Sequence, residues 1–374
     1  MTKKEDFTPV GRAEYKRRQA KAARMIREMG FSGFVAAGPS NQAYFTGARG
    51  GYSDRLYATV IAADGEVFHV CPAFEEGRMR EQWGSDADIV TWQEDEDPVK
   101  LISHRLSGLK GPVGIEDTMP LWYFSAFNAR CRQGAVDASC VTRVLRSIKS
   151  KKELELLEGS NRIIGEAVKA AFETAREGMT NLEMSEAVKE ACQERGVRGS
   201  GFVLFGEAAS FPHGTKLPQK LKKGDIMLCD AGCDLYGYIS DITRSVVFGT
   251  PNRKQKEIFK ILREAQDAAR EAAKAGNELG APDLAARKVI GKGGYGYDYE
   301  NFTHRLGHGI GLDGHEWPYL CRGKNVVLKK NMTFSNEPGI YIPGVLGMRL
   351  EDCMHIGEKG GEFFASRQKS LEEI

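Results

Sequence analysis

Acidic and histidine side chains gather in the second half of this chain. Five of the seven histidines lie beyond residue 200, close to acidic residues that stand within apolar segments: His213, His304, His308, His315 and His355. Imidazoles and carboxylates are the side chains that bind divalent metals and perform general acid–base catalysis. We therefore expect the chemistry of this protein in its second half.

The segment 225–248 is predicted to form two strands joined by a turn. If the turn centres on Leu235 and Tyr236, Asp230 and Asp241 each stand five residues from it. Directly opposed residues of an antiparallel pair share a face, with Cβ atoms about 4.5–5.5 Å apart. A bulge in the turn would shift this register by one residue. Two carboxylates so close repel each other unless one is protonated or a cation lies between them.

The same construction recurs downstream. Glu337 and Glu351 are placed symmetrically about Gly344, next to the turn-forming Pro343. A hairpin centred there opposes these two carboxylates as well. The sequence therefore predicts two pairs of facing carboxylates.

A glycine-rich segment that contains His308 lies between the two hairpins, and its glycines allow an irregular backbone that can aim imidazoles inward. Four carboxylates and one imidazole suit two metal ions that share bridging ligands, about 3.5–4 Å apart. An oxygen-rich donor set favours manganese, with cobalt, iron or zinc as alternatives.

Two domains are expected to position these residues, because the 374-residue chain exceeds one typical domain. Residues 1–147 alternate short apolar runs with helical stretches and predict a smaller α/β domain. Residues 148–374 predict an α+β domain with helices packed on an antiparallel sheet. Its expected helices are an amphipathic one through residues 156–172, one that begins at the capping box Thr180–Glu183, and one after Pro251.

Composition narrows the possible partners. The chain is 41% hydrophobic and 28% charged, with a net charge of +2. So small a net charge gives no reason to expect nucleic acid or a membrane surface as a partner, and a small, roughly neutral substrate fits better. The first thirty residues contain no apolar signal-like segment, so we expect a cytoplasmic protein.

Six short motifs then resemble a known family in order and spacing: CDAG, SDITR, HRLGHGIG, HEWP, NEPGIY and RLED. They are similar to those of the pita-bread metallopeptidases, which include prolidase and aminopeptidase P, over roughly residues 150–360. A weaker similarity over residues 10–140 resembles the creatinase-type amino-terminal domain. The resemblance implies a pita-bread catalytic domain that hydrolyses Xaa-Pro peptide bonds of di- or oligopeptides by means of a hydroxide bridging two metal ions. Homodimers are common among such enzymes.

The resemblance also implies roles for individual residues. The metal ligands would be Asp230, Asp241, His308, Glu337 and Glu351. His213 and His315 would face the substrate and stabilise the oxyanion or orient the substrate, while Glu337 would also shuttle a proton. His304 would either shape its loop or touch the substrate.

Three arginines are further candidates for substrate binding. Arg349 stands two residues before Glu351 and could neutralise the acidic cluster. Arg55 lies where creatinase-like relatives place an arginine that reaches the partner subunit's pocket. Arg322 is the candidate for anchoring a substrate carboxylate, although some prolidases have an arginine sooner after HEWP.

Two other functions remain open at this point. Creatinase-like or ectoine-type relatives hydrolyse non-peptide bonds on the same fold, and the metal-free ones lose ligand residues that this chain keeps. A non-catalytic pita-bread module that binds proteins would show broken metal motifs, which are not seen here.

Overall fold

The computed structural model describes residues 1–51, 53–215, 217–323 and 326–372, which form two compact units. The smaller unit is Val10–Arg146, and the larger one combines Met1–Pro9 with Ser147–Ile374. The first nine residues, assigned above to the amino-terminal domain, thus pack with the larger unit. Thr2 donates two hydrogen bonds to the Glu166 carboxylate there.

The smaller unit is built on a mixed six-stranded sheet with strand order β4-β3-β2-β1-β5-β6. β1 and β2 coincide with two apolar runs of the sequence, and their side chains are buried in the core. In chain order its elements are α1 Arg12–Glu28, β1 Gly33–Ala36, α2 Pro39–Thr46, β2 Ala58–Ala62, β3 Val67–Pro72, α3 Glu76–Trp83, β4 Ile89–Trp92, α4 Pro98–Arg105, β5 Val113–Ile115, α5 Leu121–Arg130, β6 Ala135–Asp137 and α6 Ser139–Ser147.

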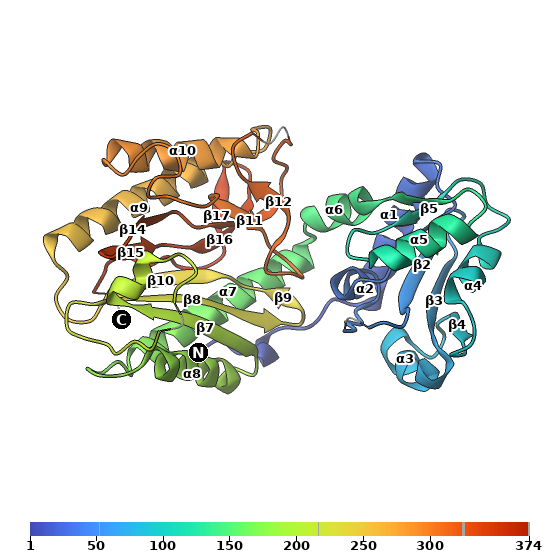
Figure 1. Cartoon of the computed structure of the whole chain (residues 1–374), viewed down its shortest axis with the longest axis horizontal. Coiled ribbons are helices and arrows are strands. Elements are labelled where there is room, and N and C mark those ends of the chain that lie inside the picture. The colour runs from blue at the N-terminus through green and yellow to red at the C-terminus, as the bar shows by residue number, and fades with distance from the viewer. Residues whose placement is uncertain (52, 216, 324–325, 373–374) are drawn as a thin grey trace. The chain divides into compact units, whose positions relative to one another are not determined.

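Four helices of the larger unit flank its strands. α7 (Lys151–Phe172) and α8 (Asn181–Glu194) pack against β7 and β8, and both begin at capping boxes. α9 (Arg253–Ala272) packs against α10 (Gly280–Lys292) and against the carboxyl-terminal strands (Figure 1). The helices expected from the sequence are confirmed as α7, α8 and α9. α10 was not predicted.

The strands of the larger unit pair antiparallel but form three ladders rather than one sheet. The first has the order β10-β8-β7, with β9 beside β8; the second has the order β12-β11-β13-β16-β17; the third is β14-β15. Their bounds are β7 Arg198–Phe205, β8 Ile226–Leu235, β9 Tyr238–Ile239, β10 Ile242–Val247, β11 Gly307–Gly309, β12 Glu316–Leu320, β13 Thr333–Asn336, β14 Gly339–Ile342, β15 Leu346–Arg349, β16 Asp352–Ile356 and β17 Gly361–Phe363.

An isolated bridge joins the first ladder to the carboxyl-terminal strands. Thr243 of β10 and Glu351 exchange both backbone hydrogen bonds, at 3.3 and 3.2 Å. One apolar core, with Leu228, Leu262 and Phe334 among its members, runs from the first ladder beneath α9 to the second. No helix in the described part of the chain is long and apolar enough to cross a membrane.

Candidate metal centre

The first hairpin places Asp230 opposite Thr243, not opposite Asp241. Tyr236 and Gly237 form a two-residue turn, both with positive φ (53° and 90°), so the turn centre lies one residue later than predicted. This shifts each partner by two positions. Because side chains alternate with a period of two, Asp241 still shares the face of Asp230, as a diagonal neighbour.

The second hairpin has the predicted register. Asn336 pairs with Asp352, and the ladder of β14 and β15 continues with the same offset, so Glu337 stands opposite Glu351. The turn lies around Gly344, which has a φ of 72°.

The bridge between Thr243 and Glu351 brings the two hairpins together. Asp230, Thr243, Glu351 and Glu337 consequently occupy one row across four neighbouring segments. The Thr243 hydroxyl donates to Glu351 Oε2 at 2.7 Å, which holds that carboxylate in the row.

His308 of β11 completes the cluster. Its Nδ1–H donates to the carbonyl oxygen of Gly309 at 3.1 Å, which leaves the lone pair of Nε2 free for a metal. Nε2 lies 3.3 Å from Glu337 Oε1 and 3.7 Å from Asp241 Oδ2.

Ligand atoms converge in three overlapping groups, each with its atoms within 4.8 Å of one another. The groups are Asp230 with Asp241 and Glu351, His308 with Glu337 and Glu351, and Asp241 with His308 and His315. The shared members match a pair of ions held close together by common ligands.

The buried carboxylates of the cluster repel one another, and bound cations would stabilise them in their ionised form. Burial and the neighbouring carboxylates raise the pKa values of Asp241 and Glu351, and burial raises the pKa of Glu337 to about 7. Burial and nearby His315 lower the pKa of His308 to about 3, so its imidazole is neutral, as a metal ligand must be. Four carboxylates and a neutral imidazole therefore fit divalent cations, which would relieve the repulsion.

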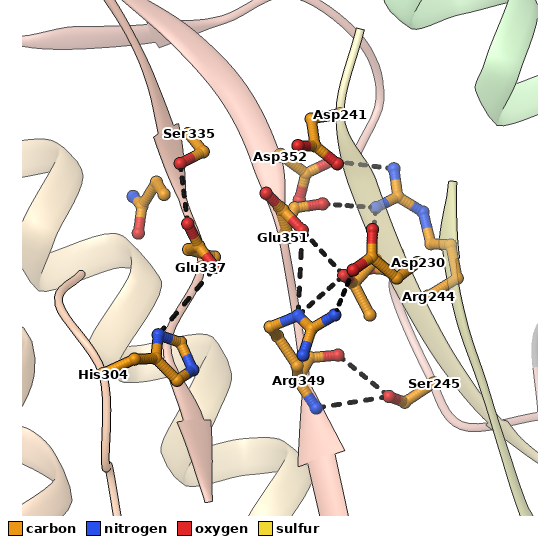
Figure 2. Close-up of polar contacts among 12 residues, drawn as sticks. Asp230, Asp241, Arg244, Ser245, His304, Ser335, Glu337, Arg349, Glu351 and Asp352 are labelled. Atoms are coloured by element: carbon orange, nitrogen blue, oxygen red, sulfur yellow. Dashed lines mark hydrogen bonds and ion pairs between the residues drawn. The ribbon is translucent and has the colours of Figure 1, made fainter. Parts of the chain in front are cut away.

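Arg349 of β15 supplies a single positive charge to these carboxylates. Its Nη2 donates to Asp230 Oδ2 at 2.6 Å, and its Nε lies 3.8 Å from Glu351 Oε2 (Figure 2). Its Nη1 donates to the Tyr341 hydroxyl, which lies 3.0 Å from His304 Nε2. Because Nδ1 of His304 donates to a backbone carbonyl, Tyr341 donates to Nε2, and both ring nitrogens are occupied within the protein.

A cavity of about 430 Å³ opens over the cluster. It is lined by Pro212, His213, Asp230, Asp241, His304, Arg305, His308, His315, Glu337, Arg349 and Glu351. Nine of the eleven residues proposed from the sequence thus line one cavity. The two that do not are Arg55 and Arg322.

Arg322 does not line this cavity, and its suggested role in anchoring a substrate carboxylate stays a prediction. Its guanidinium pairs with Asp298 and lies over the ring of Tyr299. Arg55 belongs to the smaller unit, where it hydrogen-bonds to Glu94 at 2.8 Å. Its suggested role in a partner subunit's pocket stays a prediction.

Sequence reasoning missed Arg305, whose side chain lines the cavity instead. Its Nη2 donates to His315 Nδ1 at 3.0 Å, and its guanidinium carbon lies 4.2 Å from the ring centroid of Tyr319. Thr243 and Tyr341 were missed too. Arg305, Thr243 and Tyr341 all stand inside the six motifs, so position within a motif was the available signal.

Comparison with known proteins supports the interpretation of this cluster as the metal site of a peptidase. The profile of metallopeptidase family M24 matches residues 155–358, and that of the creatinase/prolidase N-terminal domain matches residues 18–148. A putative dipeptidase, YkvY, of Bacillus subtilis is 33% identical over 92% of this chain and 96% of its own length. An Xaa-Pro dipeptidase of Lactobacillus helveticus is 34% identical over 90% of this chain and 93% of its own length.

Solved structures agree over both units. The dipeptidase PepE of Mycobacterium ulcerans superposes with a TM-score of 0.89 at 31% identity, covering 97% of this chain and 99% of its own. A dipeptidase of Pyrococcus horikoshii gives 0.85 at 31% identity, covering 95% and 99%. The expected fold is thereby confirmed. The chain belongs to metallopeptidase family M24 and carries the creatinase/prolidase-type amino-terminal domain.

Proposed function

We propose that this metallopeptidase hydrolyses Xaa-Pro dipeptides with two divalent metal ions. The observation that carries the proposal is the convergence of four carboxylates and one neutral imidazole in a single cavity that also presents an arginine. The Xaa-Pro dipeptidase of Lactobacillus helveticus, 34% identical to this chain, supports the substrate class.

The proposed metal ligands are Asp230, Asp241, His308, Glu337 and Glu351. Manganese is the favoured ion because oxygen donors dominate the set, with cobalt, iron or zinc as alternatives. When bound, such ions supply a water activated at neutral pH and a charge that polarises the scissile carbonyl.

The remaining cavity residues orient the substrate and move protons. Glu337 accepts a hydrogen bond from the Ser335 hydroxyl at 2.9 Å, which fixes one of its oxygens, and we assign it the transfer of a proton to the leaving nitrogen. To His213 and His315, which line the cavity, we assign hydrogen bonds to the oxyanion that develops on the scissile carbonyl, or orientation of the substrate. His304 is tied to the protein through both ring nitrogens and so shapes the cavity wall.

Arg305 is the proposed anchor of the substrate's free carboxylate. Within the described residues its guanidinium has no carboxylate within ion-pair distance, and its contacts are to His315 and Tyr319. A guanidinium that is held in place but not neutralised is suited to a carboxylate. Such an anchor favours dipeptides over longer peptides, because only in a dipeptide does the proline next to the scissile bond carry the free carboxylate.

The test is metal-dependent cleavage together with metal content. Protein stripped with chelator and refilled with manganese should bind about two ions per chain and cleave Xaa-Pro dipeptides faster than Xaa-Pro-Xaa tripeptides. Glu351→Gln should lose metal and activity. Glu116→Gln is the matched control, because Glu116 is a buried carboxylate of the smaller unit that binds backbone amides. Absence of cleavage of any Xaa-Pro peptide by the refilled protein would refute the peptidase assignment.

The homodimer and the cytoplasmic location stay predictions. Light scattering would test the first, and Arg55→Ala would test whether a partner subunit contributes to catalysis.

A further inference from the structure

Asp283 and Arg287 form a buried ion pair on α10 that has no part in the proposed metal binding or proton transfer. Asp283 is fully buried and Arg287 is 2% exposed, with Arg287 Nε 3.0 Å from Asp283 Oδ2. A buried ion pair contributes little net stability compared with apolar residues of the same size, because both charges lose their hydration. Its contacts therefore indicate what it does.

Arg287 holds the backbone of the segment that leads to the metal centre. Its Nη1 donates to the carbonyl oxygens of Asp298 at 2.7 Å and Phe302 at 2.9 Å, and its Nη2 donates to that of His304 at 2.6 Å. The guanidinium also lies over the rings of Tyr299 and Phe302, 4.2 and 4.4 Å from their centroids.

Asp283 holds the same segment from its other end. Its Oδ1 accepts the backbone N–H of Leu306 at 3.0 Å, and its Oδ2 accepts that of Arg322 at 3.3 Å in addition to Arg287. Leu306 in turn passes this restraint on, because its carbonyl oxygen accepts the backbone N–H of the proposed metal ligand Glu337 at 3.0 Å.

Between these contacts stands Arg305. The carbonyl before it is held by Arg287 and the amide after it by Asp283, while its own carbonyl accepts from His304 Nδ1 at 2.8 Å. With the backbone fixed on both sides, the direction in which the Arg305 side chain leaves the chain is fixed too. Movements of about 1 Å at a positioning group can cost about a hundredfold in rate.

We propose that Asp283 and Arg287 are positioning residues that set the place of Arg305 in the cavity, and thereby the enzyme's selectivity for substrates with a free carboxylate. This inference rests on the proposed function. A positioning role for Asp283 and Arg287 differs from a purely structural role in one measurable respect. A loss of folded protein lowers activity on every substrate by the same factor. A misplaced Arg305, by contrast, lowers kcat/KM only for substrates that carry the free carboxylate.

The experiment compares an Xaa-Pro dipeptide with the matching Xaa-prolinamide, in wild type and in Arg287→Met, Arg287→Lys and Asp283→Asn. The selectivity is the ratio of kcat/KM for the dipeptide to that for the prolinamide. We expect Arg287→Met to lower this ratio about tenfold or more, mainly through KM for the dipeptide. Arg287→Lys keeps the charge but not the fork of donors, so an intermediate ratio is expected.

Arg195→Met is the matched control. Arg195 is also a buried arginine of the larger unit that donates to a backbone carbonyl, that of Ala191 at 2.6 Å, but it does not line the cavity. Its removal should leave the ratio unchanged. Metal content is measured in each variant, so that a lost ion is not mistaken for a lost anchor.

Hydrogen exchange gives a readout that needs no activity. Peptides that cover residues 302–308 should exchange faster in Asp283→Asn and Arg287→Met than in wild type, and not in Arg195→Met. Equal losses on both substrates, or unchanged exchange in this segment, would overturn the inference. An inactive wild type would overturn the proposed function instead and leave the exchange measurement to decide whether the pair holds the segment.

Discussion

Replacing Arg305 and Arg322 one at a time tests which arginine anchors the substrate carboxylate. The structure favours Arg305, whereas the sequence suggested Arg322. Arg305→Met removes the cavity guanidinium but keeps an unbranched side chain that can still pack on Tyr319. Arg322→Met removes an ion pair with Asp298 whose arginine side chain is 35% exposed.

The magnitudes follow from these environments. A hydrogen bond to a charged group contributes about 1.5–3 kcal/mol, and about 1.4 kcal/mol corresponds to a factor of ten in rate. Arg305→Met should therefore lower kcat/KM for an Xaa-Pro dipeptide roughly 10- to 100-fold. A partly exposed ion pair contributes about 0–1 kcal/mol, and Arg322 does not line the cavity, so Arg322→Met should change kcat/KM by less than about threefold.

The assay measures initial rates on the dipeptide and on the matching prolinamide, with manganese-loaded protein of known metal content. Loss of the anchor should lower kcat/KM strongly for the dipeptide and only slightly for the prolinamide, because the prolinamide has no carboxylate. Equal activity of Arg305→Met and wild type on the dipeptide, or a larger loss in Arg322→Met, would refute the reasoning.

Three further outcomes are expected. Thr243→Val should weaken metal affinity about tenfold, measured by competition with a chelator, because Glu351 loses the hydroxyl that holds it; unchanged affinity would contradict this. Burial lowers the pKa of His69 to about 4, so the folded state disfavours its protonated form, and the associated stability is present above about pH 6.5 and lost as the pH falls toward 4. His69→Gln should therefore remove about 2 kcal/mol of the fall in unfolding free energy between pH 7 and pH 5, seen in urea titrations. Lys149→Met leaves the buried Glu316 without the ammonium group 2.5 Å away and should cost about 3–5 kcal/mol, whereas the double variant with Glu316→Gln should regain part of it; no recovery would argue against the ion pair as the cause.

Local patterns predicted much of the framework. Helical periodicity and capping boxes located α7, α8 and α9, because these signals depend on neighbouring residues alone. α10 (Gly280–Lys292) was not predicted, since its N-cap residue Leu279 offers no side-chain cap and the helix contains Pro282 and Gly291. Its buried pair Asp283–Arg287 is visible only once the segment that it holds is in place.

The hairpins show the same limit on a smaller scale. The second register was predicted correctly because its turn is symmetrical about Gly344. The first was displaced because Tyr236 adopts a positive φ, which a non-glycine residue rarely does, while Asp234 Oδ1 accepts the N–H of Gly237 at 2.6 Å. Asp230 and Asp241 nevertheless share one face, as predicted, because a shift of two positions preserves the alternation of side chains.

The sequence by itself determined which side chains can bind metal and which face of each hairpin they share, because both follow from residue type and from the period of a strand. Only the tertiary structure decided that the bridge between Thr243 and Glu351 merges two hairpins into one site, and that Arg305 rather than Arg322 lines the cavity. Those outcomes depend on hydrogen bonds between segments far apart in the chain, such as that from Leu306 to Asp283, and such contacts leave no periodic signal in the sequence.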